Sequence, residues 1–388
     1  MTSVASNALA SSVLAVDTIA SCVVGHLVQD DLDPGDYRHL AHYSVLRQAS
    51  LVCRAWVRPA QLLLFAFLYF SGGTRQLQRW LETVGPGPAP YPSPDVFFGD
   101  NVPPEEVSVD KWNFEVVKEV LQKVKGVKIL GLCFKGQGQI PAELLLFNGL
   151  KGLKTLIIDS PLSTPPTMAT PPFQHLETLL LTDYHPKLLR DWSSTFNFLS
   201  GTQAGSPPPL LRNLDLRFLP FPTAYLFPEL TPFAASLHLL HLPSIDSTRH
   251  LWRLEIFAQN CRQLQRLWIG VLLPYSSAGL KLLASSPLPG VWHLQIRNVY
   301  GSRGGTHDHS PGAAERDTWA ALLQLVANLP DLKLLEIGYA RFLYSEPKAE
   351  LEKLAREKGF RLSIDTIDNG FPAQQEEEFH RVVHLSVY

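Results

Sequence analysis

The chain has few of the residues that mark small disulfide-bonded or metal-binding proteins. Its 388 residues include only four cysteines, Cys22, Cys53, Cys133 and Cys261. Their spacing fits neither a zinc site nor a small disulfide scaffold. The simplest interpretation is that they are buried free thiols in a reducing compartment.

Charge of one sign and long apolar runs are also scarce. The formal net charge is −2, and charged residues make up 18% of the chain, so the composition calls for neither a nucleic acid nor an anionic membrane as partner. The most apolar run, residues 62–70, is too short to span a bilayer. Residues 1–15 lack the Lys or Arg of a secretory signal. We therefore expect a soluble protein of the cytoplasm, the nucleus or both.

Sequence signatures of catalysis are missing as well. There is no Gly-x-x-x-x-Gly-Lys-Ser/Thr, Gly-x-Ser-x-Gly or His-Glu-x-x-His, and Gly136-Gln-Gly138 alone is a weak signal. His307 and His309 flank an aspartate, but no third or fourth metal ligand accompanies them. We expect no catalytic residue, no cofactor and no metal ion, and predict that the protein is not an enzyme.

The most informative feature present is the phrase Leu-x-x-Leu-x-Leu, which occurs nine times with some replacements. Successive copies are 26, 23, 35, 26, 27, 27, 41 and 27 residues apart. A period of this length is typical of stacked repeats, which usually serve as binding surfaces. The copies begin at Val127, Leu153, Leu176, Leu211, Leu237, Leu264, Val291, Leu332 and Gly359.

Each copy is predicted to form a short strand, with a helix between strands. Phe114, Val117, Leu121 and Val124 share one helical face before the first copy, and similar patterns precede the copies at 264, 332 and 359. Repeated strand–helix units predict an α/β fold. We expect a right-handed solenoid with a parallel sheet on its concave face and helices on its convex face.

The leucines explain why the units must stack. The fourth and sixth positions of each copy are expected to point into the solenoid, against their equivalents in neighbouring repeats. Burying one such side chain contributes about 1.5–3 kcal/mol. No unit can bury its apolar face alone, so at least three are needed. The two longest steps indicate insertions at 200–209 and 301–311, both rich in Gly, Pro and Ser.

The chain divides into four predicted segments. Residues 14–70 have a helical pattern. Residues 71–110 contain a Pro/Gly-rich stretch and are predicted to be a linker or loop. Residues 111–365 carry the repeats, and residues 366–388 form a C-terminal tail.

The stretch Ala49-Ser-Leu-Val-Cys-Arg-Ala-Trp56 resembles the F-box motif, and Asn260-Cys261-x-x-Leu264 resembles the repeats of leucine-rich-repeat F-box proteins. The likeness extends from about residue 14 to residue 365. Such motifs usually open with Leu-Pro, where this chain has Val16-Asp17. The resemblance implies a three-helix module at 14–70. It also implies that the chain is the substrate-recognition subunit of a Skp–cullin–F-box ubiquitin ligase, with the F-box on the Skp adaptor and the repeats on a target protein.

The apolar positions of the predicted module carry its partner prediction. If they instead form the core of the module, the module only caps the solenoid. The chain is then a leucine-rich-repeat interaction scaffold without a ubiquitin-ligase link. The residues that match the adaptor-facing surface are Val16, Ile19, Val23, Leu27, Leu51, Val52 and Trp56.

The third, fifth and seventh positions of each copy are expected to point toward the concave face. Early copies place mainly Ile, Gly, Thr and Leu there, whereas later copies place polar and aromatic residues. This pattern predicts a recognition patch around a tryptophan flanked by Arg and His; the alternative is an ordinary solvated sheet face. The predicted target-binding residues are Asp215, Arg217, His241, Arg266, Trp268, His293, Gln295, Arg297 and Glu336.

Overall fold

The structure is a computed structural model that describes most of the repeat region. Residues 14–64, with all seven predicted adaptor-binding residues, lie outside the described residues, as do the tail at 366–388 and the insertions at 201–209 and 301–311. The described residues are 65–70, 73–99, 112–134, 138–163, 173–182, 192–200, 210–218, 227–242, 251–271, 276–286, 288–298, 313–338 and 345–364.

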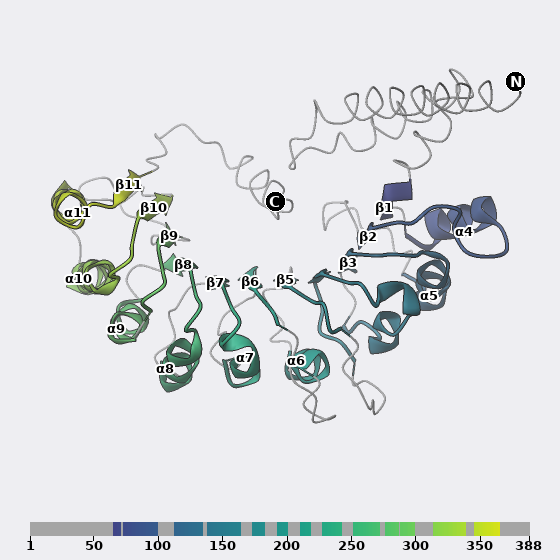
Figure 1. Cartoon of the computed structure of the whole chain (residues 1–388), viewed down its shortest axis with the longest axis horizontal. Helices are drawn as coiled ribbons and strands as arrows, with labels where there is room; N and C mark the ends of the chain where they lie inside the picture. Colours follow the sequence, from purple (N-terminus) through teal and green to yellow (C-terminus); the bar gives the residue numbers. More distant parts are fainter. Residues whose placement is uncertain are drawn as a thin grey trace, which may run out of the picture.

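Eleven parallel strands form one open sheet whose strand order follows the sequence. Figure 1 shows the strands along the inner side of an arc. The strands are β1 (Phe67–Phe70), β2 (Asp95–Gly99), β3 (Ile129–Cys133), β4 (Thr155–Ile158), β5 (Thr178–Thr182), β6 (Asn213–Phe218), β7 (Leu239–Leu242), β8 (Arg266–Val271), β9 (His293–Asn298), β10 (Leu334–Gly338) and β11 (Arg361–Ile364).

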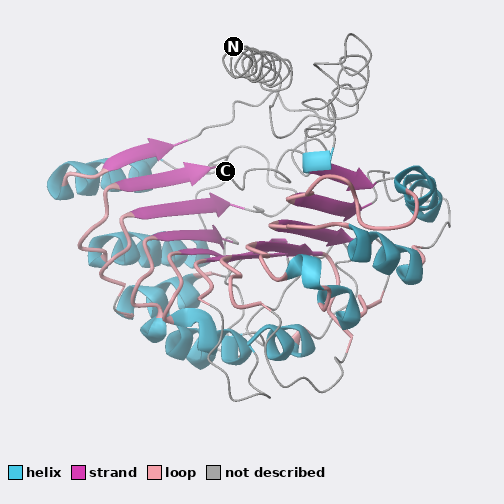
Figure 2. Cartoon of the chain, turned by 45° about the vertical axis from the view of Figure 1, so that its right-hand side comes forward, coloured by secondary structure: helices cyan, strands magenta, loops and turns pink. Residues whose placement is uncertain are grey.

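The helices of the described residues lie on the outer side of the arc (Figures 1 and 2). Two 3-10 helices occupy this layer between β3 and β4. The α/β class is thus confirmed, and the open arrangement is compatible with the predicted solenoid. The helices are α4 (Gly73–Val84), α5 (Phe114–Lys123), η1 (Ala142–Leu145), η2 (Asn148–Leu150), α6 (Ser193–Ser200), α7 (Phe227–Ala234), α8 (Leu251–Asn260), α9 (Ser277–Ser285), α10 (Ala313–Asn328) and α11 (Ser345–Lys358).

All nine predicted strands are confirmed, and each begins at the third residue of its phrase. The copy at Val127 gives β3 from Ile129, for example, and the degenerate copy at Gly359 gives β11 from Arg361. The four helices predicted from apolar periodicity are α5, α8, α10 and α11.

The array begins earlier than predicted. Residues 67–70 form β1 and not a part of the helical module. Residues 73–84 and 95–99 form α4 and β2, where a linker or loop was expected. The physical reason is that aromatic side chains take the place of leucine: Phe98 of β2 stacks on Phe70 of β1 with ring centroids 5.2 Å apart.

The Pro/Gly-rich stretch between α4 and β2, residues 85–94, has no regular secondary structure. It is nevertheless anchored. The Lys123 ammonium of α5 donates to the carbonyl oxygens of Gly85 at 2.6 Å and Gly87 at 3.1 Å. A proline-rich connection is thereby held against the repeat that follows it.

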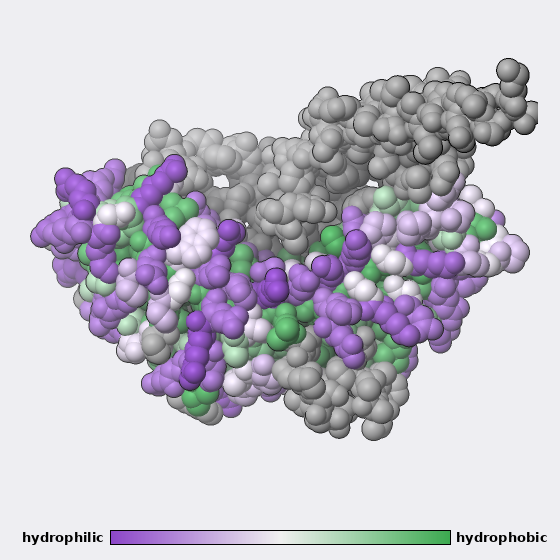
Figure 3. All heavy atoms as spheres, in the orientation of Figure 1, coloured by the Kyte–Doolittle hydropathy of each residue, from purple (hydrophilic) through white to green (hydrophobic). Residues whose placement is uncertain are grey.

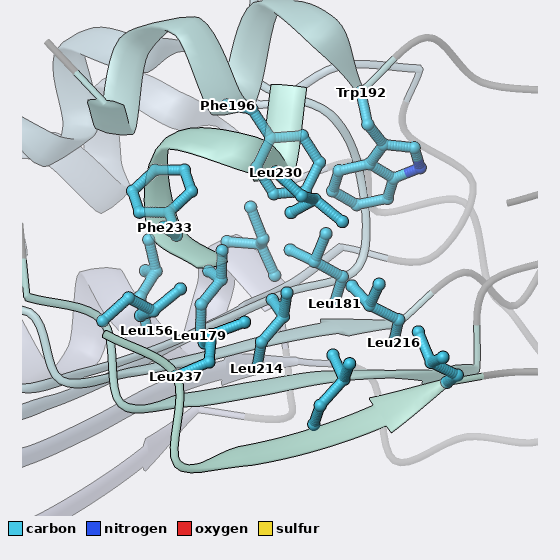
Figure 4. Close-up of a cluster of buried hydrophobic side chains, with 14 of the residues drawn as sticks. Leu156, Leu179, Leu181, Trp192, Phe196, Leu214, Leu216, Leu230, Phe233 and Leu237 are labelled. Atoms are coloured by element: carbon cyan, nitrogen blue, oxygen red, sulfur yellow. The ribbon is translucent and has the colours of Figure 1, made fainter. Parts of the chain in front are cut away.

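The core lies between the sheet and the helical layer. Leu156, Leu179 and Leu214 are register partners in β4, β5 and β6, and all three are fully buried. Figure 4 shows these leucines facing Phe196 of α6 and Leu230 of α7. The fourth positions of the phrase therefore meet their equivalents one repeat away, as predicted.

Side chains from one repeat also donate hydrogen bonds to the carbonyl groups at the helix end of the repeat before it. The Asn328 amide of α10 donates to the carbonyl of Ala284 in α9 at 2.8 Å. The Lys358 ammonium of α11 donates to the carbonyls of Val326 at 3.4 Å and Leu329 at 3.2 Å, and also contacts that of Ala327. The last carbonyls of a helix lack partners within the helix, so these contacts join successive repeats on the outer side.

Candidate recognition surface

One column of side chains runs across the sheet face opposite the helices. It consists of the fifth position of each phrase and its register partners in neighbouring strands. Because side chains alternate along a strand, this column faces away from the leucine core. Its members are Phe97, Gly131, Ile157, Leu180, Asp215, His241, Trp268, Gln295, Glu336 and Ser363.

The chemistry of the column changes between β5 and β6. From β2 to β5 it is apolar. A Cβ atom at Gly131 would lie 2.3 Å from the Phe97 ring, so the glycine leaves room for that aromatic side chain. From β6 onward the column is polar and aromatic. The register also shifts at this junction, between Leu180 and Thr182 of β5, which is typical of a β-bulge.

A buried histidine–carboxylate pair lies on one side of Trp268. Oδ2 of Asp215 lies 2.8 Å from Nδ1 of His241, and these side chains are only 8% and 6% exposed. A carboxylate only accepts hydrogen bonds, so Nδ1 of the imidazole donates. The His241 ring stacks on Trp268 with centroids 3.8 Å apart and an interplanar angle of 16°.

A second histidine–carboxylate pair lies on the other side of Trp268. The His293 ring approaches the indole edge-on at 6.4 Å, and its Nε2 lies 3.2 Å from Oε2 of Glu336. Five consecutive strands, β6 to β10, thus contribute Asp215, His241, Trp268, His293 and Glu336 to one contact series. We call these five residues the histidine–tryptophan column. The carboxylates hold the histidines, and the histidines hold the indole.

Sequence reasoning missed Trp292, which lies just before β9 at the second position of its phrase. The Arg266 guanidinium lies 5.0 Å from the centroid of the Trp292 ring. Such a cation–π contact attracts the guanidinium to the indole ring. The signal was available, because second-position residues line the edge of the sheet: the Trp292 amide donates to the Gln265 carbonyl at 3.0 Å.

The nine predicted target-binding residues are placed as follows. Five form the histidine–tryptophan column, and Arg266 and Gln295 lie beside it. Arg217 and Arg297 lie in β6 and β9, but the structure does not describe their side chains.

Exposure separates these residues into two groups. Asp215, His241 and His293 are buried, so they support the surface more than they form it. The accessible members are Arg266, which is exposed, and the half-buried Trp268, Gln295 and Glu336.

Within the described ranges, no set of three or more His, Cys, Asp or Glu side chains is arranged to hold a metal ion, and no helix is long and apolar enough to cross a membrane. His307 and His309 lie outside these ranges. Burial raises the pKa of the Cys261 thiol to about 12, which keeps it protonated at neutral pH.

Comparisons of the chain with protein-family models and with curated proteins give no match. A functional assignment therefore depends on the residues of this chain and on their arrangement.

Proposed function

We propose that the protein is a non-catalytic recognition protein, a leucine-rich-repeat solenoid whose concave sheet binds a target protein. The histidine–tryptophan column carries this proposal. Trp and Arg dominate the binding energy of protein interfaces, and Trp268 and Arg266 are both held by contacts within the sheet. A side chain that is already ordered loses little conformational entropy when a partner binds.

This role sets the loss of affinity expected when Trp268 is removed. Truncating a central interface tryptophan typically costs about 2 kcal/mol or more, which is roughly a 30-fold loss in affinity. We therefore expect Trp268→Ala to abolish most capture of the target. Ile256→Ala is the matched control, because Ile256 is a large apolar residue of α8 that is 46% exposed in the helical layer.

We further propose that the chain is the substrate-recognition subunit of a Skp–cullin–F-box ubiquitin ligase. The resemblance of residues 49–56 to the F-box motif supports this, as does the position of this stretch shortly before β1, where the array begins. In this role the protein does no chemistry. It holds the target at a high effective concentration near the transfer machinery.

A second candidate function is a recognition scaffold with no ligase link, in which residues 14–64 only cap the array. One observation favours a capping role. Within the described sheet, β1 pairs with β2 alone, and an open strand edge needs cover against unwanted pairing. Capping and adaptor binding are compatible, so the two candidates differ only in the adaptor.

Affinity purification of the full chain separates these proposals. We expect the wild-type chain to capture both a Skp-type adaptor and a target. A Leu51→Ala, Trp56→Ala double variant should lose only the adaptor, and Trp268→Ala only the target. Capture of a target without any adaptor supports the scaffold. Target capture that is unchanged by Trp268→Ala refutes recognition through the concave sheet.

A further inference from the structure

We propose that the rim of the sheet where its strands begin binds an acidic, extended segment of the target protein. This inference rests on the proposed recognition function and assigns the chemistry of the partner. It concerns the second and third positions of each phrase, which lie at the start of each strand and line one edge of the parallel sheet.

Six exposed cations lie on this rim, although the net charge of the chain is −2. Backbone hydrogen bonds link the rim from strand to strand: the Lys154 amide donates to the Lys128 carbonyl at 2.8 Å, and the Arg361 amide to the Lys333 carbonyl at 2.8 Å. The cations therefore lie along one edge in sequence order. They are Lys128, Lys154, Arg212, Arg266, Lys333 and Arg361.

The first two cations have acidic neighbours. Lys154 pairs with Glu177 at 3.1 Å. Lys128 lies close enough to Asp95 to act on it: burial raises the pKa of that carboxyl, and the positive charge of Lys128 works against the rise. This half of the rim is locally neutralised, so it offers little attraction for an acidic partner.

The other four cations, Arg212, Arg266, Lys333 and Arg361, make no ion pair with any acidic group that the structure describes. Both acidic members of the histidine–tryptophan column already contact a histidine, Asp215 at His241 and Glu336 at His293. Figure 3 shows many hydrophilic residues, which include both acidic and basic side chains, at the end of the arc around α11 and β11. A net positive rim thus adjoins the histidine–tryptophan column.

The spacing of these cations fits an extended peptide. They lie at the starts of β6, β8, β10 and β11, and neighbouring strands are about 4.8 Å apart. The backbone positions of the first three are therefore about 10 Å apart. A polyproline II segment repeats every three residues, or about 9.3 Å, so acidic residues at every third position match the spacing of the first three cations.

Arg266 is the anchor of this rim. Its guanidinium lies over the Trp292 ring, 5.0 Å from the ring centroid, and a guanidinium group can bind a carboxylate with two parallel hydrogen bonds. Four separated cations on a chain of net negative charge favour a protein segment over a nucleic acid, because polyanion binding calls for a larger positive field.

The test is a selection of short random peptides displayed on phage against the full chain. We expect enrichment of Asp and Glu at intervals of three. The affinity of an enriched peptide is then measured for the wild type, for Arg212→Gln, Arg266→Gln, Lys333→Gln and Arg361→Gln singly, and for the fourfold variant. Lys353→Gln, on the exposed side of α11, is the control for a change in net charge.

Each rim substitution is expected to weaken peptide binding about threefold, and all four together roughly 50-fold or more, with no change for Lys353→Gln. Enrichment of basic or neutral peptides, no enrichment at all, or acidic peptides that bind the fourfold variant as well as the wild type would overturn the inference. So would equally tight, rim-dependent binding of single-stranded oligothymidine. If target capture fails for Trp268→Ala but survives the fourfold variant, the proposed function stands and the rim assignment falls.

Discussion

A substitution at Gly149 tests how closely neighbouring repeats approach one another. It lies in η2, and a Cβ atom at this position would stand 2.6 Å from the backbone carbonyl oxygen of Val124, which follows α5 directly. Since the Val124 carbonyl belongs to the backbone, it cannot rotate away as a side chain could. The 3-10 helix η2 must therefore move away from α5 to relieve the clash. Overpacking of this kind costs about 1–3 kcal/mol, so Gly149→Ala should lower the free energy of unfolding by that amount.

Gly152 provides the matched control in the same connection. It is exposed, and a Cβ atom there would meet nothing within 4 Å. Gly152→Ala should therefore stabilise the chain by about 0.4–1 kcal/mol, because alanine restricts the unfolded chain. The same chemical change at two sites three residues apart is thus expected to differ by about 1.5–4 kcal/mol in its effect.

Guanidinium unfolding followed by circular dichroism checks the comparison. If the slope of the transition is unchanged, the shift of the midpoint reports stability directly. Gly149→Ala should unfold at a lower denaturant concentration than wild type, and Gly152→Ala at an equal or higher one. Equal midpoints for the two variants would refute the close contact between η2 and the end of α5.

Three further predictions concern the stability of the array and one of its thiols. Leu214→Ala should lower the free energy of unfolding by about 2–5 kcal/mol, because Leu214 is fully buried between two register partners; a cost near zero in denaturant titration would contradict the stacked core. Lys358→Met should cost about 1 kcal/mol by removing the ammonium from the end of α10, whereas Lys353→Met should cost almost nothing in the same titration. Cys261 should resist iodoacetamide in the folded chain and react after unfolding, as peptide mass spectrometry can show. Since its pKa is about 12 when folded and about 8.5 when unfolded, the unfolded thiol loses its proton first, and this group should lower stability as the pH rises between those values; alkylation at equal rates in both states would contradict its burial.

The strands could be predicted from the sequence because their signal is local and repeated. A phrase with apolar residues at fixed positions specifies both the strand and the face that it buries. β1 and β2 were not predicted, because Phe70 and Phe98 replace the leucines at the sixth position of the phrase. α7 was not predicted, because a proline in the sequence argues against a helix, yet the structure includes Pro232 within α7.

The positions of the residues on the candidate surface could be predicted from the sequence, but the contacts between their side chains could not. Asp215 and His241 are both fifth-position residues, so their adjacency follows from the register, yet the 2.8 Å contact and its burial depend on neighbours in several strands. Trp292 was missed because only residues within strands were considered. The pairing of cations with acids along the rim is also a property of the assembled edge.

The central claim is that the polar end of the inner sheet face, and not the helical layer, contacts the target. Photo-crosslinking from a benzophenone amino acid at Gln295, beside the histidine–tryptophan column, tests it most directly, with the same amino acid at Ile256 of α8 as the comparison. We predict a covalent product with the captured target from position 295 and none from position 256. A product from position 256 alone would contradict the account.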